Sequence, residues 1–186
     1  MNGIINVYKE RGFTSHDVVA KLRGILHMKK IGHTGTLDPD ATGVLPVCLG
    51  KATKVCGLLT DKDKTYRAVV KLGVMTNTED MTGEILAKHP VLVTKEQIER
   101  AVSKFVGEIE QVPPMYSAIK INGKKLYELA RQGKEVERKA RKVTIYGIKV
   151  LSIDFSENEF TMEVSCSKGT YIRTLCKDIG EFLGCG

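Results

Sequence analysis

The sequence lacks the patterns that mark zinc sites, disulfide frameworks, secretion signals and membrane spans. Its five cysteines are an odd number without a C-x-x-C pair, and no tight His/Cys cluster accompanies them. We therefore expect neither zinc nor disulfides, but free thiols in a reducing compartment. The N-terminus lacks the charged region and long apolar stretch of a signal peptide, and no apolar run reaches membrane-spanning length. These absences predict a soluble, cytoplasmic protein with no membrane partner.

Glycine patterns of cofactor sites are missing as well. The sequence contains no G-x-G-x-x-G. The segment Gly50–Thr53 does not complete a phosphate-binding loop, because Ala52 stands where the hydroxyl residue is needed and the preceding glycine is Gly43. Ser15, His16 and Asp17 are neighbours in sequence, which does not make a triad, since triads are assembled in space. The sequence therefore predicts no cofactor and no metal.

The excess positive charge is concentrated in one segment. The 186 residues are 42% hydrophobic, enough for one domain or one domain with an insertion, and carry a net charge of +7. Between Lys120 and Lys142 there are nine basic residues against three acidic ones. A solvated basic face and a nucleic-acid site both explain such a run. The interleaved Tyr116 and Tyr127 and the preceding Pro113-Pro114 favour binding to RNA phosphates, which gives affinity without sequence specificity.

The hydrophobic pattern predicts an α+β fold. Strands are expected over 3–8, 44–49, 65–72, 143–153 and 160–166, the last two forming a hairpin, and helices after Thr14 or Ser15, after the Thr94/Gln97 capping box, over 126–130 and from Ile172. Because strands and helices do not alternate strictly, we expect a mixed, largely antiparallel sheet flanked by helices, with no internal repeat.

The segment from Ile31 to Gly43 is predicted to be a loop of fixed shape, because it contains glycines and a proline. It presents His33, Asp38 and Asp40 directly before an apolar run. Taken alone, the residues favour a structural turn in which Asp38 caps its own backbone ahead of Pro39. A rigidly held carboxylate for chemistry on a base or sugar is the alternative.

Four ordered motifs resemble those of the bacterial tRNA pseudouridine synthase B (TruB) family. They are the signature segment Gly32–Val47, the triplet Lys64–Tyr66, the pair Val112–Ala118 and Leu126–Arg131, and the segment Cys166–Arg173. The resemblance runs nearly end to end. It implies a pseudouridine-synthase-like fold and a cofactor-free isomerisation of the T-loop uridine in the T-arm stem-loop of tRNA. It further implies a monomer that requires no protein partner.

The resemblance implies a role for each of several residues. Asp38 would be the catalytic carboxylate that attacks the uridine, at the ribose C1′ or at the base, and Arg173 would pair with it. Tyr66, otherwise a core tyrosine on a strand face, would stack on the flipped uracil. His33, otherwise a solvated turn residue, would occupy the space that the flipped base leaves, which offsets part of the unstacking cost.

Further residues fall at family positions with supporting roles. Asp80, Tyr171 and Lys9 would lie near the pocket, although this chain has Lys9-Glu10 where the family usually has Lys-Pro. Residues 112–142 would form an RNA-binding thumb within a catalytic domain over 1–186. Its RNA-contacting side chains would include Lys120, Lys124, Lys125, Arg131 and Arg141.

Family members continue past Gly186, so we expect a truncated catalytic domain without the family's C-terminal RNA-binding module. Two alternatives stay open. The chain could be a non-catalytic RNA-binding or tRNA-folding fragment, or a relative of the guide-RNA-dependent pseudouridine synthases.

Overall fold

The computed structural model describes residues 1–186, which form two units, Met1–Lys62 and Asp63–Gly186. Each unit has its own sheet and its own hydrophobic core. All strand pairings are antiparallel, which agrees with the predicted α+β class. No helix combines the length and apolar character needed to cross a membrane.

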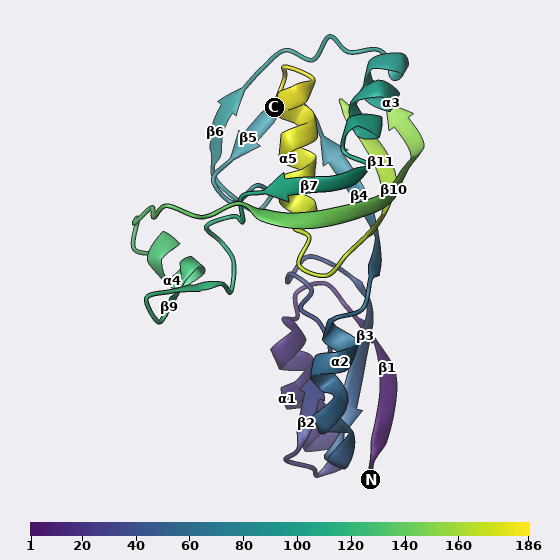
Figure 1. Ribbon diagram of the computed structural model, residues 1–186, viewed down its shortest axis with the longest axis vertical. Helices are drawn as coiled ribbons and strands as arrows, with labels where there is room; N and C mark the ends of the chain where they lie inside the picture. Colours follow the sequence, from purple (N-terminus) through teal and green to yellow (C-terminus); the bar gives the residue numbers. More distant parts are fainter. The chain divides into compact units, whose positions relative to one another are not determined.

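The first unit is a three-stranded sheet with one long helix against it (Figure 1). The strands follow the order β1-β3-β2, and β3 pairs along its whole length with β1. Val18 and Val19 of the helix pack on Leu45 and Val47 of β3. The elements are β1 (Gly3–Lys9), α1 (Ser15–Leu26), β2 (Ile31–His33), β3 (Gly43–Leu49), the 3₁₀ helix η1 (Gly50–Val55) and α2 (Cys56–Thr60).

Helix α1 begins where the sequence predicts, after Thr14, and the structure shows that the cap is a capping box. The Thr14 side chain accepts a hydrogen bond from the backbone N–H of Asp17 (3.0 Å), and the Asp17 carboxylate accepts one from the backbone N–H of Thr14 (2.8 Å). The helix ends at His27, which has left-handed backbone geometry with φ of 49°. These two ends fix the chain direction into β2.

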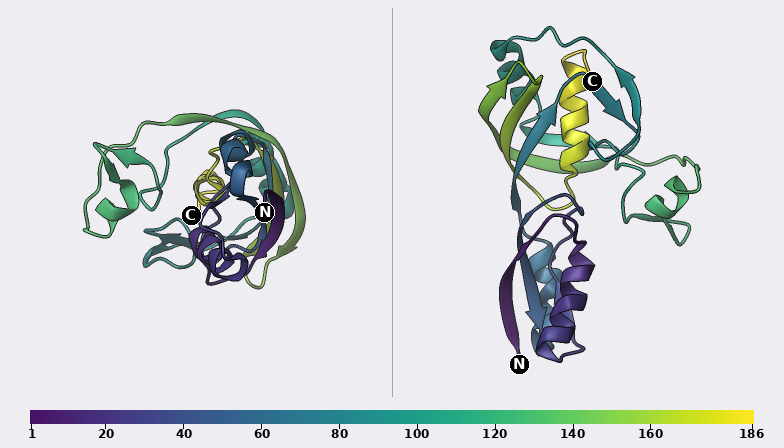
Figure 2. Two further views of the ribbon diagram at one scale, coloured as in Figure 1. Left: turned by 90° about the horizontal axis from the view of Figure 1, so that it is seen from below. Right: turned by 180° about the vertical axis from the view of Figure 1, so that it is seen from behind.

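The second unit is built on the four-stranded sheet β4-β11-β10-β7, with α3 and α5 against one face (Figures 1 and 2). The rings of Phe105, after α3, and Phe182, in α5, meet edge to face at 6.2 Å. The main elements are β4 (Lys64–Lys71), α3 (Lys95–Lys104), β7 (Gly107–Gln111), β10 (Arg141–Asp154), β11 (Glu159–Cys166) and α5 (Ile172–Phe182).

Alternation along β11 determines which face of this sheet is buried. Phe160, Met162, Val164 and Cys166 are all at most 1% exposed, as their two-residue spacing predicts. They pack with Leu175 and Ile179 of α5 and with Ile98 of α3. Both helices therefore cover the same face.

Two small hairpins complete the second unit. One is β5 (Val74–Thr76) with β6 (Ile85–Lys88), and Glu79 in the turn between them contacts Thr174 and Lys177 of α5. The other is β8 (Lys120–Ile121) with β9 (Lys124–Lys125), followed by α4 (Leu126–Ala130). In Figures 1 and 2, β9 and α4 lie apart from the four-stranded sheet, and single stretches of chain connect them to it.

The structure corrects the prediction at several elements. Ile31–His33 is a short strand paired with β3, because its backbone completes the ladder that β3 offers, so the fixed loop is shorter than predicted. The helical segments η1 and α2 and the strands β5, β6 and β7 were not predicted. The capping box of α3, the β10–β11 hairpin and the short helix α4 are confirmed.

Candidate functional site

The loop that carries Asp38 is bonded through its backbone to a buried lysine, Lys9. Lys9 is fully buried, and its ammonium donates hydrogen bonds to the carbonyl oxygens of Phe13 (2.7 Å), Glu10 (3.0 Å) and Pro39 (3.2 Å). Burial lowers the pKa of Lys9, while the negative charges of Asp38 and Asp40 oppose that shift. Lys9 thus ties the turn directly after Asp38 to the end of β1.

Further bonds fix the same loop from α1 and β3. The buried Ser15 hydroxyl accepts the backbone N–H of Leu37 (2.9 Å), and the carbonyl of Pro39 also accepts the N–H of Gly12 (2.9 Å). At the loop's start, the N–H of Thr34 donates to the carbonyl of Pro46 (3.1 Å). Asp38 itself is exposed and bonds through its carbonyl to the N–H of Ala41 (3.0 Å). The arrangement presents a carboxylate on a backbone fixed at several points.

His33 ends β2 and is half-buried rather than a solvated turn residue. Its Nδ1 is buried without a hydrogen-bond partner, and burial lowers the pKa of the imidazole. Beside it lies an open cavity of about 520 Å³, whose lining includes Arg23, Lys29 and Lys30. The first unit therefore sets an imidazole whose charged form is disfavoured by burial next to a basic surface.

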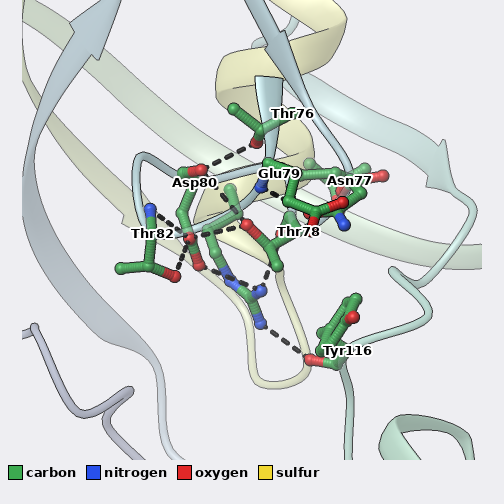
Figure 3. Close-up of polar contacts among 10 residues, drawn as sticks. Thr76, Asn77, Thr78, Glu79, Asp80, Thr82 and Tyr116 are labelled. Carbon is green, nitrogen blue, oxygen red and sulfur yellow. Dashed lines mark hydrogen bonds and ion pairs between the residues drawn. The ribbon is translucent and has the colours of Figure 1, made fainter. Parts of the chain in front are cut away.

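In the second unit, Arg173 is the centre of a polar network, and Figure 3 labels its partners Thr78, Asp80 and Tyr116. Its Nη1 donates to the carbonyl of Thr78 (2.9 Å) and pairs with the Asp80 carboxylate (3.3 Å). Its Nη2 donates to the carbonyl of Tyr116 (3.0 Å). The guanidinium, only 15% exposed, thereby joins the first turn of α5 to the β5–β6 turn and to the start of the predicted thumb.

Asp80 is held in its ionised form by this network. Burial, the largest single influence, raises its pKa, but hydrogen bonds from Thr82 and Thr78 and the charge of Arg173 outweigh it, so the pKa lies below its ordinary value. Oδ1 accepts from the Thr82 hydroxyl (2.6 Å), the Thr78 hydroxyl (2.8 Å) and the Thr82 N–H (3.0 Å). The sequence pointed to Asp80 and Arg173 separately but not to their ion pair. The predicted pairing of Arg173 with Asp38 stays a prediction.

Tyr171 is fixed by a residue that sequence reasoning missed. The buried Gln111, at the end of β7, accepts the backbone N–H of Tyr171 (3.0 Å) and donates to its carbonyl (3.1 Å). This pair of bonds fixes the start of α5, two residues before Arg173. The sequence signal that could have identified Gln111 is its position, because the alternation along 107–111 places this polar residue on the buried face.

Tyr66 lies on β4 opposite Val164 of β11, on the side that packs against the core. It is half-buried, so part of its surface stays accessible. The core packing expected from its strand pattern is confirmed, and stacking on a uracil stays a prediction.

Of the five predicted RNA-binding cations, four are exposed and two lie against the same aromatic ring. Lys120 and Lys124 are exposed on the β8–β9 hairpin, and Arg141 is exposed at the start of β10. Lys125 and Arg131 lie 5.2 and 5.3 Å from the ring centre of Tyr127. The Tyr127 hydroxyl also bonds to Lys125 (3.1 Å), which raises the pKa of that lysine.

Part of the basic segment is neutralised within the chain. Arg138 pairs with Glu135 (3.0 Å), and Lys142 pairs with Glu108 (2.8 Å). No group of three or more His, Cys, Asp or Glu side chains is arranged to hold a metal ion, and all five cysteines are free thiols.

Comparison with known proteins relates these features to a family. The model of the "TruB family pseudouridylate synthase (N terminal domain)" matches residues 23–172. The chain belongs to the TruB family. The matched residues contain the Asp38 loop, Tyr66, Asp80 and the basic segment, and they end one residue before Arg173.

The TruB relatives are close in sequence. The tRNA pseudouridine synthase B of Alkaliphilus oremlandii (strain OhILAs) is 61% identical over 186 residues, which are all of this chain and 62% of that protein. The protein of the same name from Lachnoclostridium phytofermentans (strain ATCC 700394 / DSM 18823 / ISDg) is 65% identical over 192 aligned residues, again all of this chain and 62% of that protein. The chain thus spans about 62% of the length of these relatives.

Solved structures support the same fold. A chain in "Crystal Structure of a Cbf5-Nop10-Gar1 Complex" has a TM-score of 0.77 and 36% identity, aligned over 99% of this chain and 45% of that one. A chain in "Structure of H/ACA RNP bound to a substrate RNA containing 2'-deoxyuridine" has a TM-score of 0.72 and 33% sequence identity, aligned over 99% of this chain and 44% of that one. The pseudouridine-synthase-like fold predicted for the TruB family is confirmed.

Proposed function

We propose that this chain is the catalytic part of a tRNA pseudouridine synthase that isomerises the T-loop uridine of tRNA. It acts as a monomer, without a cofactor or a protein partner. The observation that carries the proposal is membership of the TruB family over residues 23–172, a match that includes the fixed loop of Asp38. Close relatives named tRNA pseudouridine synthase B support the choice of tRNA as substrate.

Asp38 is the catalytic carboxylate of the proposed reaction. It attacks the uridine, at the ribose C1′ or at the base, and forms a transient bond there while the bond from C1′ to N1 breaks and the base turns. The bond to Asp38 breaks again as the base rejoins the ribose, so the carboxylate is regenerated. A new bond joins C1′ to C5, the proton on C5 leaves, and N1 takes up a proton. The step needs no oxidant or reductant. The bonds that Lys9 and Ser15 make to the loop support this role, because they fix the backbone on either side of Asp38 before substrate binds.

Arg173, Tyr66 and His33 complete the proposed site. In the proposed reaction the guanidinium of Arg173 pairs with Asp38 and keeps that carboxylate ionised and oriented. Arg173→Lys, which cannot pair at two points, is therefore expected to be nearly inactive. Tyr66 stacks on the extruded uracil. His33 fills the space that the uracil leaves in the T loop, and it thereby offsets part of the few kcal/mol that unstacking costs.

Residues 112–142 form the proposed thumb over the T-arm stem-loop. In this proposal the cations Lys120, Lys124 and Arg141, and the two beside Tyr127, contact phosphates. The exposure of the first three supports this role. Reversing the charge of Lys124, Lys125 and Arg131 is therefore expected to weaken RNA binding and to flatten its dependence on salt. An unchanged salt slope would identify the segment as a solvated face.

The decisive experiment is tritium release from a T-arm hairpin whose uridine carries tritium on C5. The chain is expected to release the label, and Asp38→Asn to release none while binding the hairpin with unchanged affinity. Asp40→Asn is the matched control, because Asp40 is an exposed carboxylate in the same loop. Equal turnover by wild type and Asp38→Asn would refute the role of Asp38. Binding without any release would favour a non-catalytic RNA-binding fragment.

A guide-RNA-dependent synthase is the second candidate function. The observation that favours it is the likeness to chains from a Cbf5-Nop10-Gar1 complex and an H/ACA RNP. The same assay separates the two functions, because release from the bare hairpin, without guide RNA or added proteins, contradicts the second candidate.

A further inference from the structure

The turn that brings Asp80 to Arg173 contains an unusual residue. Glu79 has φ of 61°, in the left-handed region where glycine and asparagine are common and other residues are rare. It stands directly between Thr78, whose carbonyl accepts from Arg173, and Asp80, whose carboxylate pairs with the same guanidinium. The backbone geometry at Glu79 therefore sets the relative placement of both acceptors (Figure 3).

The Glu79 side chain is anchored on α5. Its Oε2 accepts a hydrogen bond from the hydroxyl of Thr174 (2.6 Å), and Oε1 pairs with the ammonium of Lys177 (3.5 Å). The carboxylate is only 13% exposed, and Thr174 is 2% exposed. Because Thr174 directly follows Arg173, the anchor holds the β5–β6 turn against the same helical turn that carries the guanidinium.

The choice of glutamate matches this anchoring. Glycine would adopt the left-handed geometry without a steric cost but would leave the buried Thr174 hydroxyl without this partner. Rare backbone geometries, such as that of Glu79 with its largely covered and hydrogen-bonded side chain, cluster at functional sites.

We propose that Glu79 is a positioning residue, which places the Thr78 carbonyl and the Asp80 carboxylate against Arg173 by anchoring the β5–β6 turn to α5. The proposal rests on the proposed function in one respect: the arginine that Glu79 positions belongs to the proposed site. Glu79 itself touches neither Arg173 nor substrate in this assignment. Its effect on turnover passes through the turn.

The test compares four single variants, the double variant Glu79→Gln/Lys177→Met and one control variant with wild type. Glu79→Gly removes the anchor and suits the backbone, Thr174→Val removes the donor at nearly constant shape, and Lys177→Met removes the cation. Glu79→Gln keeps an oxygen that accepts from Thr174 and serves as the conservative rescue. Glu84→Gln, an exposed carboxylate beside the same hairpin, is the matched control. Single-turnover tritium release, RNA affinity, melting temperature and hydrogen exchange of the Thr82 N–H are measured for each.

Glu79→Gly and Thr174→Val are expected to slow the single-turnover step about 10- to 100-fold, with RNA affinity within about twofold of wild type. The single-turnover rate of Glu79→Gln is expected to lie between the rates of these two variants and that of wild type. The double variant Glu79→Gln/Lys177→Met is expected to be no slower than the slower of its two single variants. Exchange of the Thr82 N–H, which donates to Asp80, rises in Glu79→Gly while the melting temperature stays near that of wild type. Replacing a residue that only stabilises the fold would instead lower the melting temperature, without a selective loss of turnover and of protection at the Thr82 N–H.

Two results overturn the inference. One is wild-type turnover by both Glu79→Gly and Thr174→Val, and the other is unchanged Thr82 exchange in Glu79→Gly. Failure of the proposed function gives a different result, which is no tritium release by wild type. In that case Thr82 exchange alone decides whether Glu79 fixes the turn.

Discussion

Replacing the buried Gln111 by methionine tests how the start of α5 is held. The side chain makes two hydrogen bonds to Tyr171, each of which contributes about 1 kcal/mol. Methionine is similar in size but makes neither bond. The Tyr171 carbonyl keeps the N–H of Leu175 (3.0 Å), so the main new penalty is the unpaired N–H of Tyr171. The expected loss is about 2–3 kcal/mol in the free energy of unfolding, or roughly 5–10 °C in melting temperature.

Urea unfolding of Gln111→Met measures the loss, and hydrogen exchange of the Tyr171 N–H shows where it arises. Gln132→Met serves as the control, because Gln132 is exposed. It is expected to change the free energy of unfolding by less than about 0.5 kcal/mol. A Gln111→Met protein as stable as the control, or one with unchanged exchange at Tyr171, would show that Gln111 does not hold α5.

The remaining predictions concern the second unit. Burial raises the pKa of Asp178 to about 6, although the charge of Lys177 opposes this shift. The folded state therefore binds more protons than the unfolded state, and the free energy of unfolding falls as pH rises from about 4 to about 6. Asp178→Asn is therefore expected to raise the urea midpoint at pH 7.5 but not at pH 4, and an equal gain at both would contradict this. Thr94→Ala removes half of the α3 capping box and should cost about 1 kcal/mol in urea unfolding, whereas the exposed Ser103→Ala near the helix end should cost less. Met162→Ala leaves a cavity at a fully buried position and should lower the free energy of unfolding by about 2–5 kcal/mol. The control Val69→Ala, at an exposed position of β4, should lower it by less than about 0.5 kcal/mol. Similar losses for the two variants would disprove the assignment of the buried face.

Local signals in the sequence were sufficient for the elements that depend on neighbouring residues. The helix cap at Thr14 or Ser15 and the capping box at Thr94 depend only on residues a few positions apart, and the alternation along β11 needs only one strand. These features were predicted correctly. The strand Ile31–His33 was not, because its three residues become a strand only through pairing with β3, which lies further along the chain.

The candidate site divides in the same way. The family motifs pointed to Asp38, Asp80 and Arg173 individually. The bonds that fix them come from residues far apart in sequence, such as Lys9 to Pro39 and Gln111 to Tyr171, and from the left-handed geometry of Glu79. No spacing within a single element encodes such contacts, so the supporting residues required the structure.

The burial of Lys9 makes its amine a chemical reporter on the Asp38 loop. Its three donors are all occupied by carbonyl oxygens, and none of its surface is exposed, whereas Lys29 and Lys30 are exposed. An acylating reagent should therefore modify those two lysines at once and reach Lys9 only when the loop opens. Mass spectrometry of the acetylated chain over time would give the opening rate of the loop, and RNA that closes over Asp38 should slow that labelling further.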